Sequence, residues 1–450
     1  MRRGLVHVEP FTLHPFTIHV PDAVLADLRA RIQGTRWPDE APGEPWSQGV
    51  DSGYLRSLLA YWADGFDWRA QEQRLNSYQH RIAEVDDARI HFVHHRAANG
   101  NGIPLVLTHG WPSTFAELLG VVDRLIEAHD DRFDLVVPSL PGYAFSTRPP
   151  RVGIDRREVA RLWHLLMSGL GYERYGAHGG DFGAGVATHM ALLEPERMLG
   201  IHLSTPEMWP YTGPGTPPLT DAEQAYVDHI ARWDETERGY SAVQSTRPQT
   251  LGYALNDSPA GLAAWILDKW RSWSDSRGDL DATFGRDELL TTLTLYWATG
   301  SITSSMRDYY DNRWHGVTMG PEDFVRVPTA MAVFTESLVS EGEPPRSWYE
   351  RLYEVRRWTV FPRGGHFAAG EVPGVVAGDI AGVLVRWGYP VGRRADKFPK
   401  APPALAVDAG FFSLDSGSAR LLVDGTGKSP AQRASTSSDW LRLRFCGADE

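Results

Sequence analysis

Strands and helices alternate along much of the chain, and this alternation restricts the possible fold more than any other feature of the sequence. Apolar stretches that indicate strands lie at 89–94, 104–108, 134–138, 198–203, 327–334 and 358–361. Stretches with helical periodicity lie between or after them, at 114–129, 157–171, 184–193 and 373–387. Strands that alternate with helices predict an α/β fold, a mostly parallel sheet with helices on both faces.

Other segments surround this alternating region. From about residue 14 to 86 the apolar spacing is helical, which predicts an N-terminal helical strap packed on the main domain. From 205 to 310 strand signals vanish and Trp and Tyr crowd a helical stretch, which predicts a cap over the carboxyl edge of the sheet, where α/β proteins bind ligands. The predicted parts are a strap (1–88), a core (89–204 and 311–392), a cap (205–310) and a flexible tail (393–450).

The composition argues against several classes of partner. A net charge of −12 disfavours nucleic acid or an anionic membrane surface. Cys446 is the only cysteine, so no intrachain disulfide can form. No apolar run approaches the ~18 residues that a membrane span needs, and the N-terminus lacks the apolar region of a signal peptide. We expect a soluble, cytoplasmic protein with neither a nucleic-acid nor a membrane partner.

The stretch Gly179-Gly180-Asp181-Phe182-Gly183 lies where a predicted strand meets a predicted helix. In a turn of this pattern the backbone of the central residue is strained and its side chain projects out of the turn. The flanking glycines have no Cβ, so the strand and the helix can approach each other closely. An aspartate is ionised at pH 7 and can attack carbon directly, so Asp181 is a candidate nucleophile. Asp is also a preferred N-cap, so the motif alone leaves a purely structural role open.

Two backbone N–H groups are candidates for stabilising negative charge at this turn. Trp111 lies in His109-Gly110-Trp111-Pro112 after a predicted strand, and Phe182 follows Asp181. Hydrolases build an oxyanion hole from N–H groups at these two positions. Pro112 has no N–H, so Trp111 is the donor on its side. The alternative for the first motif is an ordinary strand-to-helix turn.

A candidate general base and its acid partner follow later in the chain. His366 follows Gly364 and Gly365 in a loop after the last predicted strand, so we expect it at the carboxyl edge of the sheet. A histidine in such a loop can act as a general base near neutral pH. A histidine base needs a carboxylate that fixes its tautomer. We favour Glu336, at the end of strand 327–334, while Glu341 and Glu343 follow closely and remain alternatives.

Tyrosines in the predicted cap are candidates for activating the substrate. Tyr309 ends the run Ser304-Ser305-Met306-Arg307-Asp308-Tyr309, and Tyr240 lies earlier in the cap. A tyrosine in an aromatic-rich cap is more often a packing residue than a catalytic one. A pair of phenols directed at the nucleophile could donate hydrogen bonds to a developing alkoxide.

Together these stretches resemble the epoxide hydrolase family of the microsomal and juvenile-hormone type, which has the α/β-hydrolase fold and an N-terminal epoxide hydrolase domain. The resemblance covers about residues 11–388. The further matching motifs are Thr35-Arg36-Trp37-Pro38-Asp39, Phe66-Asp67-Trp68-Arg69, Leu255-Asn256-Asp257-Ser258-Pro259 and Gly364-Gly365-His366-Phe367-Ala368-Ala369. Two departures are Phe182, where the family often has Trp, and the missing membrane-anchoring helix of the animal relatives, which implies a soluble bacterial form.

By position, the resemblance implies that Asp181 is the nucleophile, His366 the base and Glu336 the acid. It implies ring-opening roles for Tyr309 and Tyr240; Tyr310 adjoins Tyr309 and remains an alternative to it. The implied reaction converts an epoxide to a vicinal diol through an alkyl ester on Asp181. No metal or organic cofactor is expected, the partners are an epoxide and water, and homo-oligomerisation is left open.

Two rival functions use the same features. A haloalkane-type dehalogenase can use an Asp–His–acid set, but it needs halide-binding N–H donors rather than phenols. A catalytically silent hydrolase-fold receptor would only bind a ligand, and such proteins usually lose a member of the catalytic set. The aromatic cap favours a bulky aryl or polycyclic epoxide. Together with an arginine-rich composition, it motivates a hypothesis of natural-product biosynthesis, for example of enediyne antibiotics, rather than detoxification.

Overall fold

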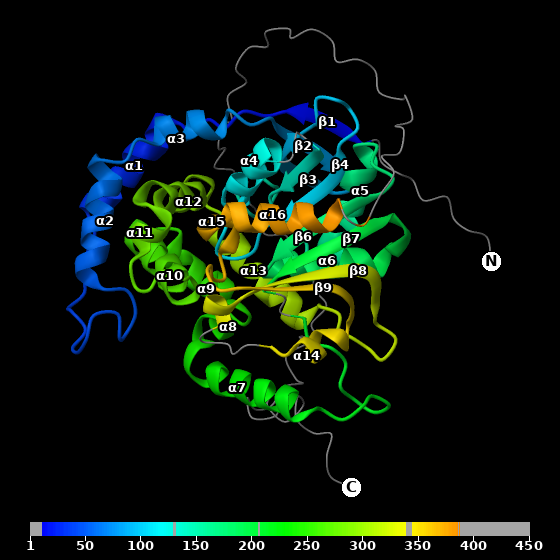
Figure 1. Cartoon of the computed structure of the whole chain (residues 1–450). Helices are drawn as coiled ribbons and strands as arrows, with labels where there is room; N and C mark the ends of the chain where they lie inside the picture. The colour runs from blue at the N-terminus through cyan, green and yellow to red at the C-terminus, as the bar shows by residue number, and fades with distance from the viewer. Residues whose placement is uncertain (1–10, 129–131, 206–207, 339–343, 386, 388–450) are drawn as a thin grey trace, which may run out of the picture. The chain divides into compact units, whose positions relative to one another are not determined.

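The computed structural model describes residues 11–128, 132–205, 208–338, 344–385 and 387, so the predicted tail (393–450) lies outside the described residues. These residues form a nine-stranded sheet with the order β1-β2-β3-β5-β4-β6-β7-β8-β9 (Figure 1). The strands are β1 (Thr12–Pro15), β2 (His80–Val85), β3 (Ala88–His95), β4 (Ile103–Thr108), β5 (Phe133–Pro138), β6 (Tyr175–Gly180), β7 (Met198–Ser204), β8 (Val325–Phe334) and β9 (Tyr353–Phe361).

The sheet is parallel from β5 to β9 and antiparallel at its other end, where β1, β2 and β3 pair in sequence and β3 joins β5. The predicted α/β class is therefore confirmed. The prediction of helix throughout 14–86 is wrong at both ends of that segment, because β1 and β2 are strands of the main sheet. In β2 the residues Ile82, Ala83 and Val85 are buried, a pattern too short for periodicity to identify.

Helices cover both faces of the sheet, and the alternating side chains of its central strands show which helices lie on which face. Leu105 and Leu107 of β4 share a core with α4 (Leu119–Ala128) and α16 (Pro373–Leu384). Val106, between them, points to the other face and packs in the core that contains α5 (Arg156–Gly169) and α6 (Phe182–Leu193). The parallel part of the sheet is thus buried on both sides, as its nearly continuous apolar strands require.

The segment between β7 and β8 is the predicted cap, and its described residues form helices. They are α7 (Asp221–Glu237), α8 (Gly239–Gln244), α9 (Pro248–Leu255), α10 (Pro259–Trp273), α11 (Leu280–Phe284), α12 (Arg286–Thr299) and α13 (Ile302–Trp314). Short helices complete the core: η1 (Phe115–Leu118), η2 (Pro195–Arg197), η3 (Thr335–Leu338), α14 (Arg346–Glu350) and α15 (Ala368–Glu371).

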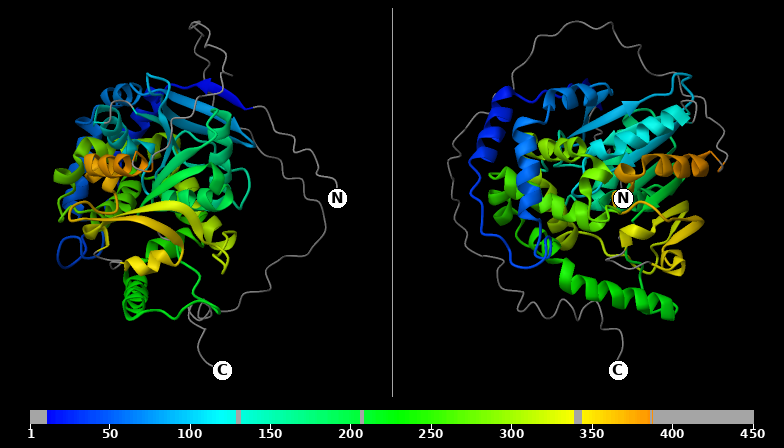
Figure 2. Two further views of the ribbon diagram at one scale, coloured as in Figure 1. Left: turned by 45° about the vertical axis from the view of Figure 1, so that its right-hand side comes forward. Right: turned by 60° about the vertical axis from the view of Figure 1, so that its left-hand side comes forward.

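The N-terminal strap, which the sequence predicts to pack on the main domain, also contacts the helices of the predicted cap. Its helices are α1 (Asp22–Gln33), α2 (Ser52–Asp64) and α3 (Trp68–Leu75), and they run alongside the cap helices (Figure 2). The Trp62 indole donates to Thr294 Oγ1 at 2.9 Å, and Tyr54 donates to Asp281 at 2.9 Å. We infer that these hydrogen bonds from the strap fix the position of α11 and α12.

A buried ion pair joins α16 to the sheet and leads to a stability prediction. Asp379 accepts a hydrogen bond from His202 Nε2 at 3.0 Å and pairs with Arg357. Burial acts to raise the pKa of Asp379, but these two partners outweigh it and lower the pKa. The stabilisation is therefore present above the ordinary carboxyl pKa and is lost as the pH falls through the lowered value.

We expect Asp379→Asn to lower the free energy of unfolding at pH 7 by about 3 kcal/mol, because it removes the buried carboxylate that pairs with Arg357 and His202. Acid should destabilise the variant less steeply than the parent protein. Urea unfolding at pH 7 and pH 3.5, with the exposed Asp27→Asn as control, measures both effects. A loss below about 0.5 kcal/mol would be typical of a surface site and would contradict this account.

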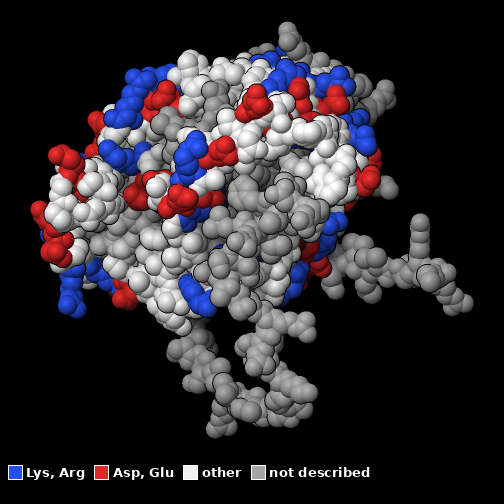
Figure 3. All heavy atoms as spheres, turned by 90° about the horizontal axis from the view of Figure 1, so that it is seen from below, with Lys and Arg blue, Asp and Glu red and all other residues white. Residues whose placement is uncertain are grey.

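Charged residues of both signs lie close together on the face shown in Figure 3. Exposed ion pairs also join separate parts of the chain, such as Arg31 with Asp257 at 2.6 Å between the strap and the cap. Across the residues that the structure describes, none of the helices has both the length and the apolar character needed to cross a membrane.

Candidate active site

Asp181 occupies a sharp turn between β6 and α6, at the carboxyl edge of the sheet. Its backbone has φ 53° and ψ −126°, a conformation that residues with a side chain rarely adopt. The flanking glycines permit the turn: a Cβ on Gly179 would collide with the backbone of Gly183, and one on Gly183 would collide with Thr108. An ordinary N-cap is extended and accepts from the second or third helical residue, whereas Asp181 accepts from Phe182, the first.

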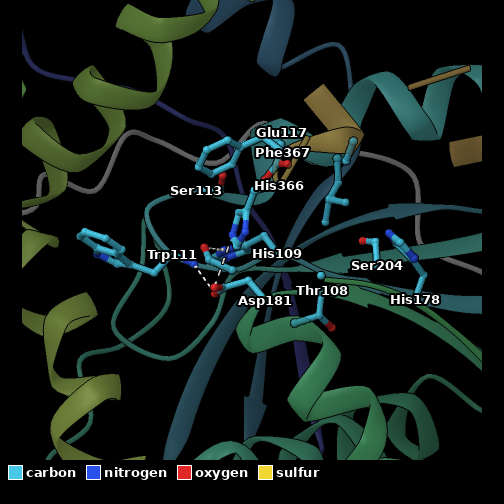
Figure 4. A pocket seen from close by; sticks show the side chains of 14 residues that line it. Thr108, His109, Trp111, Ser113, Glu117, His178, Asp181, Ser204, His366 and Phe367 are labelled. Atoms are coloured by element: carbon cyan, nitrogen blue, oxygen red, sulfur yellow. Dashed lines mark hydrogen bonds and ion pairs between the residues drawn. The ribbon is translucent and has the colours of Figure 1, made fainter. Parts of the chain in front are cut away.

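The two oxygens of the Asp181 carboxylate have different surroundings. Oδ1 accepts hydrogen bonds from the backbone N–H groups of Trp111 at 3.0 Å and Phe182 at 2.6 Å. Oδ2 lies 3.4 Å from Nε2 of His366, farther than in a strong hydrogen bond. Figure 4 shows the two side chains pointing toward each other. Burial acts to raise the pKa of Asp181, but the interactions with His366 and the two N–H groups lower it, so the carboxylate is ionised at pH 7.

His366 lies in the loop between β9 and α15, and the chain holds this loop with backbone hydrogen bonds. The His366 N–H donates to the carbonyl of Trp273 at 2.8 Å, which ties the loop to cap helix α10. Glu371 accepts from the N–H groups of Gly365 at 2.9 Å and Phe367 at 3.0 Å, on either side of the histidine. These contacts hold the backbone on both sides of His366, whose side chain is buried beside Asp181.

Glu336, the predicted acid, lies in η3 directly after β8 and is half-buried. No hydrogen bond to His366 is described for it within the part of the chain that the structure covers. Glu341 and Glu343, the alternatives, lie outside the described residues. The assignment of the acid therefore stays a prediction.

Aromatic rings from the cap surround Trp111 next to Asp181. Tyr240 of α8 stacks on Trp111, with centroids 5.6 Å apart and planes 9° apart. Tyr309 of α13 meets Trp111 edge to face at 5.5 Å, Phe182 at 4.9 Å and Tyr240 at 5.8 Å. The ring of Tyr310 instead packs on Trp314 and His315. Of the two neighbouring tyrosines, Tyr309 is the one brought to Asp181.

Several residues that support this site were not identified from the sequence. Glu371 and Asp275 hold the His366 loop, since Asp275 accepts from the N–H of Gly364 at 3.2 Å and pairs with Arg363. His109 accepts from the N–H of Leu140 at 3.1 Å, and burial lowers the pKa of His109 to about 4. For Glu371 the only signal in the sequence is its position five residues after the histidine, which does not reveal the contact.

Within the described part of the chain, no three His, Cys, Asp or Glu side chains form a group that could hold a metal ion. The groups around Asp181 can instead supply a carboxylate, an imidazole, two N–H donors and two phenols. This set suits nucleophilic attack on carbon followed by hydrolysis of the resulting ester.

The chain is similar to known protein families and proteins. A family model described as "Epoxide hydrolase N terminus" matches residues 13–118, and one described as "alpha/beta hydrolase fold" matches residues 103–256. A Stigmatella aurantiaca protein whose name proposes an epoxide hydrolase is 39% identical over 81% of this chain and 83% of its own. Epoxide hydrolase 1 of Sus scrofa is 33% identical over 83% of this chain and 88% of its own.

The solved structures include the juvenile hormone epoxide hydrolase of Bombyx mori, with a TM-score of 0.72, 30% identity and coverage of 84% of this chain and 94% of that one. Fold and turn thus define an α/β hydrolase with an aspartate at the turn where this fold presents its nucleophile. The chain belongs to the epoxide hydrolase family and is an enzyme of that family. The predicted family is confirmed.

Proposed function

We propose that this enzyme opens an epoxide to a vicinal diol through a covalent ester on Asp181. The observation that carries the proposal is the asymmetry of the Asp181 carboxylate, with two N–H donors on Oδ1 and His366 next to Oδ2. Oδ2 is the oxygen left for attack. Oδ1 would become the ester carbonyl oxygen, already located where an oxyanion can be stabilised.

In the first half-reaction Oδ2 attacks an oxirane carbon and the carbon–oxygen bond of the ring breaks. The phenols of Tyr309 and Tyr240 hydrogen-bond the ring oxygen, and one of them gives it a proton. The contact of both rings with Trp111, whose N–H holds Asp181, supports this role. The products of this step are a hydroxyalkyl ester of Asp181 and a phenolate.

In the second half-reaction His366 takes a proton from water, and the water oxygen attacks Cγ of Asp181. The negative charge that forms on Oδ1 is stabilised by the N–H groups of Trp111 and Phe182. The bond from Cγ to the substrate oxygen then breaks, and the leaving alkoxide takes the proton from His366. This leaves the Asp181 side chain as a protonated carboxylic acid, which then ionises and returns a proton to the tyrosine phenolate. A carboxylate such as Glu336 would stabilise the imidazolium.

The phenol roles lead to a prediction with a neighbouring control. We expect Tyr309→Phe and Tyr240→Phe each to slow ester formation about 100-fold, the range of a positioned proton donor, while a preformed ester hydrolyses at the normal rate. Tyr310→Phe should change neither step. Stopped-flow mixing with styrene oxide measures ester formation. If the Tyr310 variant is impaired and the Tyr309 variant is not, the assignment is off by one residue.

We propose a bulky aryl or polycyclic epoxide as the substrate. The rings of Trp111, Tyr240, Tyr309 and Trp273 are packed together beside Asp181 and His366, and such walls favour apolar, aromatic ligands. A role in natural-product biosynthesis rests on this aromatic wall and on the arginine-rich composition. A panel of aryl and polycyclic epoxides beside short aliphatic ones tests the substrate class. Faster turnover of the aliphatic compounds would overturn both proposals.

A further inference from the structure

A small cavity lies next to Asp181 and His366 and has a polar lining (Figure 4). Its volume is about 20 Å³, which is room for about one water molecule. Asp181, His366, Ser113, Glu117, Ser204 and His178 contribute side chains to its wall. A cavity that holds water needs several polar partners, and this wall supplies them.

Ser113 and Glu117 are the groups on the His366 side of this cavity (Figure 4). The Ser113 hydroxyl is buried and has no regular hydrogen-bond partner among the residues that the structure describes. Burial raises the pKa of Glu117 to about 7. The Ser113 hydroxyl lies close to the Glu117 carboxyl and acts in the opposite direction, but its effect is smaller. The charges of His366 and Asp181 also act on this carboxyl, so Glu117 is near both reacting groups.

The backbone explains why these two side chains meet at the site. Ser113 lies in the turn that leads from Trp111 into η1 (Phe115–Leu118), and Glu117 is a residue of η1, so the segment that supplies the Trp111 N–H also supplies both polar groups. The Ser113 carbonyl accepts from the hydroxyl of Tyr296 at 2.9 Å, which ties this turn to cap helix α12. A rigid turn of this kind can hold a water at a fixed distance from Cγ of Asp181.

We propose that Glu117 and Ser113 hold the hydrolytic water in this cavity, between His366 and the ester carbon of Asp181. The inference rests on the proposed function, since it assigns residues to the second half-reaction. The water gives one proton to His366 Nε2 while its oxygen bonds to Cγ. Glu117 and Ser113 orient the water through hydrogen bonds and are neither consumed nor ionised in the step. Glu117 is thus a water-positioning residue, one that the first half-reaction does not need.

The test separates the two half-reactions in Glu117→Gln and Ser113→Ala. Wild-type and variant proteins are mixed with styrene oxide, ester formation is followed by tryptophan fluorescence, and the ester on the Asp181 peptide is quantified by mass spectrometry. We expect ester formation within about twofold of the wild type and ester hydrolysis about 100-fold slower in Glu117→Gln, the effect of a misplaced reactant. The values of kcat and KM should then fall together, leaving kcat/KM unchanged.

The exposed carboxylate of Glu127, ten residues further along the chain in α4, provides the control Glu127→Gln, which should behave as wild type. The proposal is overturned if ester formation and ester hydrolysis slow by the same factor in Glu117→Gln and in Ser113→Ala. It is also overturned if ester hydrolysis in Glu117→Gln stays within twofold of the wild-type rate. If the wild type forms no ester on Asp181 while making diol, the proposed function itself fails. The wild-type measurement therefore distinguishes the two failures.

Discussion

Replacement of Asp181 by alanine or asparagine is expected to abolish diol formation, with a loss of at least ~10⁴-fold in kcat/KM. Alanine removes the attacking oxygen. Asparagine keeps the shape of the side chain and an oxygen for the N–H groups of Trp111 and Phe182, but it lacks the negative charge that makes Oδ2 a nucleophile. Product analysis by chromatography after extended incubation with styrene oxide measures the loss.

The exposed Asp27→Asn is the control for this prediction, because it makes the same chemical change away from the site. Circular dichroism establishes that each variant is folded. Diol production by folded Asp181→Ala at more than one hundredth of the wild-type rate would mean that water attacks the epoxide directly. The covalent mechanism would then be wrong.

Replacement of His366 by glutamine is expected to trap the ester. The histidine is needed to take a proton from water, so ester hydrolysis should slow by about 10³-fold or more, within the range of general base catalysis. Ester formation should slow far less, because Asp181 attacks as a carboxylate. Mass spectrometry of the Asp181 peptide should show close to one substrate adduct per site.

The exposed His19→Gln provides the matched control and should form no lasting adduct. Loss of diol formation without an adduct in His366→Gln would have a different meaning. It would place His366 in the first half-reaction, for example as a structural partner of Asp181 at 3.4 Å, and the proposed division of roles would fail.

The sequence predicts those parts of the fold in which local pattern and final structure agree. Buried parallel strands such as β4 and β5 are short apolar runs, and the Gly-x-Asp-x-Gly stretch requires a backbone that few other residues tolerate. The sequence pattern places β1 and β2 in a helical strap, which is wrong. Their conformation is determined by pairing within the sheet, a long-range interaction that the local pattern does not reveal. The contact of the strap with the cap is long-range in the same way.

The same distinction applies to the candidate site. Asp181, Trp111 and Phe182 are recognisable because their roles depend on backbone turns that the neighbouring residues define. Glu371, Asp275 and Glu117 act through contacts made only after the chain has folded, and an acidic residue on a short helix or in a turn gives no signal of burial. Tyr309 and Tyr310 are adjacent and chemically identical, so only the helix orientation separates them.

The most direct test of the covalent mechanism is a single turnover of styrene oxide in ¹⁸O-labelled water with enzyme in excess. The diol and the peptide that contains Asp181 are then analysed by mass spectrometry. The proposed mechanism predicts label in the carboxylate of Asp181 and little in the diol, because the water oxygen enters at Cγ and Oδ2 leaves with the product. Label in the diol alone would show direct attack by water on the epoxide and would contradict the role of Asp181 as nucleophile.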